Sequence, residues 1–337
     1  MSKTKRRILV AAGVCTALVI GGYARLDATA FSLLLVGFVL LIGGAEVLVR
    51  GAVSISKRMG ISSLVVGMTV VAFGTSAPEL AAGLQAVLSN RPEINIGNIV
   101  GSNIANVGLI LGLTAMVYPI STHLTVLRRE VPFMIVVTLL GYIVMSNGRV
   151  ERWEGVILVT LLFAFIYACY RLNRGNEETK SVQKVTGSKW IGSAQVLVGL
   201  VGLAIGSGFL VNSTQSIAEG LGVNMVVVSL TLVAFGTSLP ELATCLIAAF
   251  RREPDLVVGN VIGSNIFNLL FVLGVTSIVR PLEVAASVIG RDALVMIGFA
   301  IICLPMMLTR GKLTRFEGLL LFVCYIAYTV LVFVFAK

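Results

Sequence analysis

The sequence predicts an all-α membrane protein with ten core transmembrane helices in two inverted five-helix repeats, plus an N-terminal signal peptide or extra helix. Three observations support this fold class: the composition, a succession of long apolar runs, and a duplicated motif. The chain has 337 residues, of which 57% are hydrophobic and 12% charged, and its mean hydropathy is +0.98. Soluble domains carry about 25% charged residues, so this composition indicates a membrane protein.

Apolar runs long enough to cross a bilayer recur along the whole chain, since a spanning helix needs about 20 apolar residues. Continuous runs favour helices over a membrane β-barrel, whose strands alternate apolar and polar residues with a period of two. The expected spans are residues 8–26, 31–50, 61–88, 94–117, 131–147, 153–172, 190–211, 222–250, 256–279, 292–309 and 316–336.

The first 30 residues form a separate segment. Basic residues between positions 3 and 7 precede the apolar run 8–26, and Ala28, Thr29 and Ala30 follow it. This order is typical of a secretory signal peptide, yet the run is also close to the length of a transmembrane helix. Both alternatives stay open, and both place the N-terminus in the cytoplasm and residue 31 outside.

The basic residues support this orientation. When successive spans alternate in direction, most of the 26 Lys and Arg residues fall on the cytoplasmic side, as the positive-inside rule requires. The polar segment 173–189, which separates the two halves, lies on that side. The formal net charge of +10 is therefore a topology signal. A nucleic-acid partner is not expected, because the Lys and Arg residues lie at the ends of the spans, as topology determinants do.

A duplicated motif relates the two halves. VVAFGTSAPELAAG at 70–83 returns as LVAFGTSLPELATC at 232–245, always with an offset of 162 residues. Each half contains five spans. Because five is an odd number, the second half enters the membrane from the opposite side, an arrangement found in secondary transporters. The expected organisation is an N-terminal segment 1–30, a first repeat 31–172, a cytoplasmic linker 173–189 and a second repeat 190–337.

The span 61–88 contains polar residues and a proline in a stretch that should be a smooth membrane helix. As a straight helix it would reach about 42 Å, longer than the hydrocarbon core of about 30 Å. Gly74 and Pro78 are expected to break the helix and to free the carbonyls of Ala72 and Thr75. In a membrane, freed carbonyls are tolerated only where the backbone lines a cavity or is buried in protein.

The broken spans and the spans after them are rich in oxygen ligands. Glu79 and Glu241 each place a carboxylate near mid-membrane, where an unpaired charge costs at least a few kcal/mol. Carboxylate, hydroxyl and amide oxygens suit hard cations such as Ca²⁺ and Na⁺, so a bound cation or a proton is expected to share the site. In the following spans, polar residues recur every fourth position and share one face: Asn98, Ser102, Asn106, Asn260, Ser264 and Asn268.

Other polar residues are interpreted structurally. Asn103 and Asn265 lie off the polar face and are expected to pack helices together. Glu46 and Arg50 are four residues apart near the cytoplasmic side and are expected to form an ion pair. His123 falls in a loop, and the cysteines lack metal-site spacing, so neither is assigned a role.

At GTSAPE…GNIVGSNIAN and GTSLPE…GNVIGSNIFN, the chain resembles the prokaryotic-type sodium/calcium exchanger family of the cation/calcium antiporter superfamily. The resemblance covers residues 31–337. It implies a multi-pass cell-membrane antiporter that exchanges sodium for calcium by alternating access, with these ions and the lipid bilayer as its partners. The cation ligands that it implies are Ala72, Thr75, Ser76, Glu79, Ser102, Asn106, Ala234, Thr237, Ser238, Glu241, Ser264 and Asn268.

Alternatives within this interpretation remain open. A calcium/proton antiporter could use the same carboxylates to carry protons, and a cation channel would conduct without a counter-ion. Inverted broken helices favour an antiporter. Dependence of calcium flux on a sodium gradient would distinguish the sodium/calcium exchanger from the calcium/proton antiporter, and continuous conduction without counter-ion coupling would indicate a channel. No nucleophile–base pair or phosphate loop is found, so neither an enzyme nor a cofactor is expected. The glycine-rich spans 31–50 and 190–211 are candidates for sliding elements.

Overall fold

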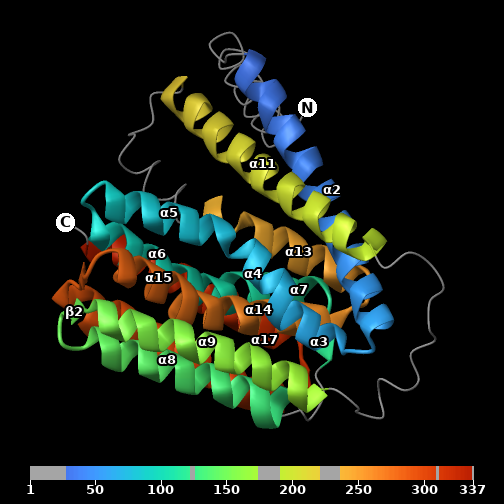
Figure 1. Cartoon of the computed structure of the whole chain (residues 1–337). Coiled ribbons are helices and arrows are strands. Elements are labelled where there is room, and N and C mark those ends of the chain that lie inside the picture. The colour runs from blue at the N-terminus through green and yellow to red at the C-terminus, as the bar shows by residue number, and fades with distance from the viewer. Residues whose placement is uncertain (1–27, 122–125, 174–189, 221–235, 309–310, 336–337) are drawn as a thin grey trace, which may run out of the picture.

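The computed structural model describes residues 28–121, 126–173, 190–220, 236–308 and 311–335 (Figure 1). This part of the chain is mostly helical, and the prediction of an all-α membrane fold is confirmed. The predicted segment 1–30 lies outside the described residues except for positions 28–30, the predicted linker 173–189 does so except for Asn173, and His123 is also outside them. The α-helices are α2 (Ala28–Met59), α3 (Ser63–Val66), α4 (Ala72–Thr75), α5 (Ala77–Leu88), α6 (Pro92–Ala105), α7 (Gly112–Val117), α8 (Val131–Met145), α9 (Arg152–Asn173), α11 (Trp190–Gly220), α13 (Leu239–Phe250), α14 (Pro254–Phe267), α15 (Leu273–Val279), α16 (Ala293–Leu308) and α17 (Arg315–Phe335).

Short π-helical turns join several of these helices into longer spans. Where the repeated motif ends, α6 continues through one such turn into α7, and α14 continues in the same way into α15. π-turns are rare and frequently occur at functional sites, and the sequence did not predict them. The five turns are η1 (Gly67–Val71), η2 (Asn106–Leu111), η3 (Val126–Glu130), η4 (Asn268–Val272) and η5 (Val288–Asp292).

The helices α2 and α11 extend further than the apolar runs 31–50 and 190–211. The helix α2 continues past Arg50 to Met59 and is followed by Gly60 at φ +64°. A residue in the left-handed conformation is a common helix terminator, and glycine adopts it readily. The predicted boundary was therefore wrong: a charged residue marks the end of an apolar stretch, while the backbone hydrogen bonds continue until a stop residue is reached.

Glycines bring α2 and α11 into backbone contact. The two helices cross the rest of the molecule side by side (Figure 1). A Cβ added at Gly44 would lie 2.8 Å from the backbone nitrogen of Leu203, and one added at Gly199 would lie 2.6 Å from that of Leu48. Small residues permit this close approach in membranes, so α2 and α11 form one tightly packed pair.

A second close crossing lies at the centre of the molecule, where α14 packs against the span that contains α3, η1 and α4. A Cβ added at Gly263 would lie 2.7 Å from the carbonyl oxygen of Met68, and one at Gly259 would lie 2.5 Å from that of Leu64. Every residue from Leu256 to Phe267 is buried. The polar face of α14 is therefore enclosed by protein.

Two short antiparallel strand pairs tie loops of the first half to loops of the second. The strand β1 (Ile120–Ser121) pairs with β4 (Lys312–Leu313), and β2 (Arg149–Val150) pairs with β3 (Leu282–Glu283). These two-residue strands are too short to have a periodicity that sequence patterns reveal. Backbone pairing in these two places connects the first half of the chain to the second.

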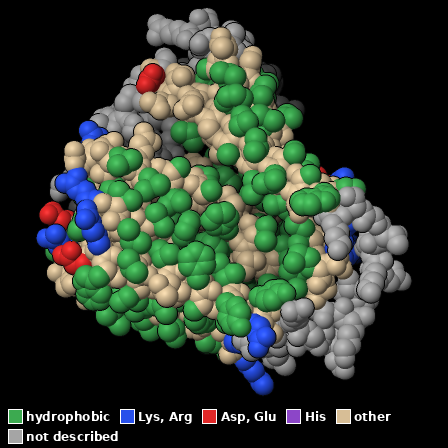
Figure 2. All heavy atoms as spheres, viewed as in Figure 1, with side chains coloured by type: hydrophobic (Ala, Val, Ile, Leu, Met, Phe, Trp, Pro, Cys, Tyr) green, Lys and Arg blue, Asp and Glu red, His purple; other side chains and the backbone are tan. Residues whose placement is uncertain are grey.

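The surface of the molecule is widely apolar. Figure 2 shows hydrophobic side chains over most of the visible face, with charged side chains toward its margins. Val39 is 71% exposed and Phe163 is 63% exposed. Exposed apolar area of this extent marks a surface that contacts a membrane or a protein, and the long apolar spans indicate the membrane.

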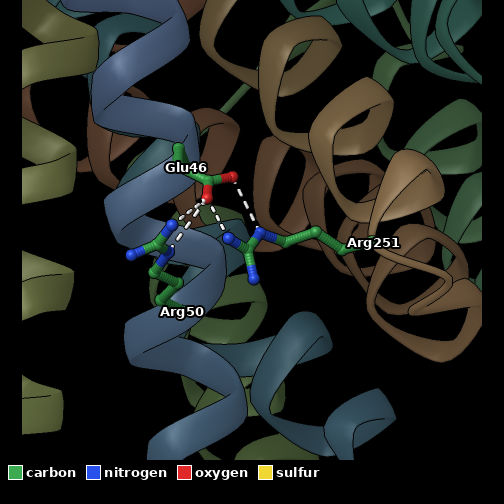
Figure 3. A network of polar contacts seen from close by, with 3 residues as sticks. All are labelled: Glu46, Arg50 and Arg251. Atoms are coloured by element: carbon green, nitrogen blue, oxygen red, sulfur yellow. Dashed lines mark hydrogen bonds and ion pairs between the residues drawn. The ribbon is translucent and has the colours of Figure 1, made fainter.

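An ion cluster joins α2 to α13. Glu46 and Arg50 form the predicted ion pair at 2.7 Å, and Arg251, just after α13, also pairs with Glu46 (Figure 3). The sequence did not predict the contact with Arg251, because the two residues are 205 positions apart. The cluster connects the α2–α11 pair to the helix that carries Glu241.

Candidate functional site

The two broken helices have the same backbone geometry. The helix α4 ends at Thr75, Ser76 lies at φ −82° and ψ 2°, and α5 begins with Pro78 in its first turn. In the second repeat, Ser238 lies at φ −87° and ψ 0°, and Pro240 is in the first turn of α13. The predicted break is confirmed, and both repeats make it with a single turn residue.

One detail of the predicted break was wrong. The carbonyl of Ala72 keeps a helical partner, because the N–H of Ser76 donates to it at 2.9 Å. Pro78 lacks an N–H, and in an α-helix that group would serve the carbonyl four residues earlier, which belongs to Gly74. The matching residue of the second repeat, Ala234, lies outside the described residues.

The two carboxylates are buried and meet between the repeats. Glu79 is 1% exposed and Glu241 is 2% exposed. The carboxyl group of Glu79 lies near the hydroxyl of Thr237, and that of Glu241 lies near the hydroxyl of Thr75 and near Glu79. Each carboxylate therefore faces the broken turn of the opposite repeat. The Oε2 atom of each lacks a hydrogen-bond partner among the described residues.

Threonine–asparagine hydrogen bonds hold each broken turn to the opposite half. The hydroxyl of Thr75 donates to Asn260 Oδ1 at 3.2 Å, and the hydroxyl of Thr237 donates to Asn98 Oδ1 at 3.3 Å. The two bonds are related by the repeat, since the two threonines are 162 positions apart and so are the two asparagines. Asn98 and Asn260 were placed on the polar face, but their contacts with the threonines were not predicted.

The remaining polar residues of the predicted site are also buried. Ser102 and Asn106 on one side, and Ser264 and Asn268 on the other, are at most 3% exposed. A buried polar atom without a partner costs about 1–3 kcal/mol, so several in one place indicate a ligand. Within the described part of the chain, site atoms without a partner are Ser76 Oγ, Glu79 Oε2, Ser102 Oγ, Ser238 Oγ, Glu241 Oε2, Ser264 Oγ and Asn268 Oδ1.

The donor set suits a hard cation. The described residues contain no group of three or more His, Cys, Asp or Glu side chains that could hold a metal. A cation at Glu79 and Glu241 would therefore take its other ligands from hydroxyl, amide and carbonyl oxygens. Ca²⁺ accepts six to eight such oxygens in flexible geometry. Two carboxylates also match the charge of one divalent ion.

Asn103 and Asn265 were predicted to pack helices together, and their contacts also join the two halves. The amide nitrogen of Asn103 donates to the backbone carbonyl of Asn265 at 3.4 Å, and the amide nitrogen of Asn265 lies 3.5 Å from the sulfur of Met134. A further contact was missed: Asn268 Nδ2 donates to Asn103 Oδ1 at 3.1 Å. Asn103 therefore touches a residue of the predicted site.

A buried, oxygen-lined site between two broken, inverted helices is the architecture of a secondary transporter. The family model described as "Sodium/calcium exchanger protein" matches residues 29–171 and 191–334. The chain belongs to this family.

Similar proteins agree with this assignment. The putative antiporter CaxA of Alkalimonas amylolytica is 38% identical, covering 89% of this chain and 97% of the relative. The sodium/calcium exchanger MaX1 of Methanosarcina acetivorans is 34% identical, and the match covers 90% of this chain and 98% of the relative. A structure of the sodium–calcium exchanger NCX_Mj soaked with Na⁺ and Ca²⁺ superimposes with a TM-score of 0.79 at 28% identity, covering 90% of this chain and 99% of that one.

Proposed function

We propose that this protein is a secondary active antiporter that exchanges sodium for calcium across the cell membrane by alternating access. The observation that carries the proposal is the pair of buried carboxylates, Glu79 and Glu241, that face each other's broken helices. Membership of the sodium/calcium exchanger family supports the choice of ions. The wide apolar surface indicates that lipid surrounds the helices.

In this proposal, calcium takes mainly the carboxylates of Glu79 and Glu241 and oxygens of Thr75 and Thr237. Sodium ions take overlapping and flanking positions. Because both ions use one set of oxygens, they bind alternately. The full set of proposed ligands is Ala72, Thr75, Ser76, Glu79, Ser102, Asn106, Ala234, Thr237, Ser238, Glu241, Ser264 and Asn268, with Ala72 and Ala234 acting through backbone carbonyls.

Coupling follows from the electrostatics of the site. An empty site with two carboxylates is costly inside a bilayer, so loaded states change sides far more readily than the empty one. The α2–α11 pair is the proposed moving element, because its contacts with the core are less extensive than those between its own helices. If a cycle moves net charge, the membrane potential contributes about 2.3 kcal/mol per charge per 100 mV.

Uptake of ⁴⁵Ca²⁺ into proteoliposomes tests the proposal. Calcium should accumulate when sodium is loaded inside and absent outside, and should not accumulate when choline replaces sodium. Accumulation driven equally well by a proton gradient alone would identify a calcium/proton antiporter. Calcium entry without any counter-ion would identify a channel.

Potassium is expected to be unnecessary. Asn106 and Asn268 are neutral amides at matching positions of the repeats, so the site has two formal negative charges. Binding K⁺ together with Ca²⁺ would place three positive charges against two negative ones, which is unfavourable at low dielectric. Sodium-driven calcium flux should persist when choline replaces K⁺ on both sides. Loss of flux on K⁺ removal, restored when K⁺ is added back, would contradict this expectation. The variant Asn268→Asp adds a third negative charge to the site, so it should strengthen the binding of a monovalent cation or a proton.

Transport is expected to fall at acidic pH. Metal ligands must be deprotonated to bind, so a proton on Glu79 or Glu241 removes one of the two charges that balance Ca²⁺. Initial rates of sodium-driven ⁴⁵Ca²⁺ uptake, measured at equal pH on both sides, should decline as the pH is lowered, and higher calcium should restore them. Rates that stay constant through the acidic range would argue against shared carboxylate ligands.

A further inference from the structure

Three asparagine groups form a hydrogen-bonded relay that ends in the proposed site. The backbone carbonyl of Asn265 accepts from the amide nitrogen of Asn103 at 3.4 Å. The amide oxygen of Asn103 accepts from Asn268 Nδ2 at 3.1 Å. All three side chains are at most 3% exposed. The relay therefore links a fixed backbone group to a side chain of the site without access of bulk water.

The direction of the relay follows from donor and acceptor chemistry. A backbone carbonyl can only accept, so it requires the NH₂ group of Asn103 on its side and turns the amide oxygen toward Asn268. That oxygen also only accepts, so Asn268 must present its NH₂ group to Asn103. The remaining atom, Asn268 Oδ1, lacks a partner among the described residues and is left for the site.

This orientation matters because the two ends of an amide have nearly the same shape and opposite polarity. Its surroundings decide which end faces a given neighbour. An oxygen attracts a cation, whereas an NH₂ group in the same place repels it. Without the relay, Asn268 could rotate and offer either end.

The second half does not repeat the relay. Asn265 is the repeat mate of Asn103, and Asn106 is the mate of Asn268. The amide nitrogen of Asn265 contacts the sulfur of Met134, and its amide oxygen has no partner among the described residues. The identical Asn of the two motifs thus has a different environment in each repeat.

We propose that Asn103 is a positioning residue that holds Asn268 with its oxygen toward the transported cation. The inference rests on the proposed function, because it takes Asn268 as a cation ligand. It predicts that Asn103 tunes the affinity for the ion and not the rate of the conformational change.

The test measures calcium dependence of sodium-driven flux in proteoliposomes. Asn103→Ala should raise the KM for calcium about 3- to 10-fold, the loss expected from one oriented hydrogen bond, and should leave kcat within about twofold. Calcium titration by calorimetry in detergent should show the same weakening. Asn95→Ala is the matched control: Asn95 lies on the same helix, is buried, and donates to Thr276 at 2.8 Å in the other half, yet it does not contact Asn268.

A double substitution separates positioning from packing. A carboxylate presents oxygen in both orientations and needs no relay, so adding Asn103→Ala to Asn268→Asp should no longer raise the KM. If Asn103→Ala is not recovered as a monodisperse protein, Asn103→Ser replaces it, with the same expected shift. An unchanged KM in the single variant, or an equal rise in the Asn268→Asp background, would overturn the inference. Wild-type protein without sodium-driven flux would instead contradict the proposed function.

Discussion

The variants Glu79→Gln and Glu241→Gln are expected to abolish sodium-driven calcium transport without preventing membrane insertion. Each carboxylate supplies half of the negative charge that faces one Ca²⁺. Glutamine keeps the size of the side chain but removes its charge, leaving a divalent cation with one compensating charge in a buried site. Uptake of ⁴⁵Ca²⁺ should fall to the level of protein-free vesicles, and calcium binding measured by calorimetry should be lost.

The matched control is Glu93→Gln, because Glu93 is an exposed carboxylate in the first turn of α6. It should transport at the rate of the unmodified protein. Insertion is checked by comparing the yield and the elution volume of all three variants in detergent. Flux of ordinary size in either Glu79→Gln or Glu241→Gln would eliminate the proposed site.

The second large effect is expected at the contact of α2 and α11. The variant Gly44→Val places side-chain carbons where the backbone of α11 already lies, because even a Cβ would be 2.8 Å from Leu203 N and 2.9 Å from Gly199 O. Backbone atoms cannot move aside as a flexible side chain can, and overpacking costs about 1–3 kcal/mol or more. The helices should separate, and transport should fall at least tenfold. The thermal unfolding temperature in detergent should also fall.

Gly43→Val is the control for this prediction. It makes the same change one position earlier on α2, where an added Cβ meets no atom within 4 Å in the described structure. Both variants alter the helix propensity equally, so a difference between them reports the contact alone. Equal behaviour of Gly43→Val and Gly44→Val would show that the close approach of the two helices is unimportant.

Much of the fold could be predicted because membranes make sequence patterns simple. Long apolar runs, the positive-inside bias and an odd number of spans per repeat determine the helices and their inverted arrangement. The repeat also predicted both breaks, which the structure places at Ser76 and Ser238. Helix ends were less predictable, as α2 shows, because they depend on single stop residues such as Gly60.

The details of the candidate site depend on contacts between distant segments, which no local pattern reveals. The bonds from Thr75 to Asn260 and from Thr237 to Asn98 span 185 and 139 positions. The repeat does carry one signal for these bonds: the offset of 162 residues converts one threonine–asparagine pair into the other. The Asn103–Asn268 bond had no such signal, because only one repeat forms it. A duplication in sequence thus does not guarantee a duplication of contacts.

The ion cluster at Glu46 makes the two orientations of the transporter unequal in free energy. Under the repeat offset, Glu46 corresponds to Gly208 and Arg251 corresponds to Ser89, and neither of these residues can carry a charge. If the halves exchange conformations as the site changes sides, which inverted repeats allow, the ion pair is lost without an equivalent forming. A partly exposed ion pair contributes about 0.2–1 kcal/mol, so the resting population would favour one orientation by up to about fivefold. A protein with nearly symmetric ion ligands would then have an asymmetric resting state, set by one ion pair at its periphery.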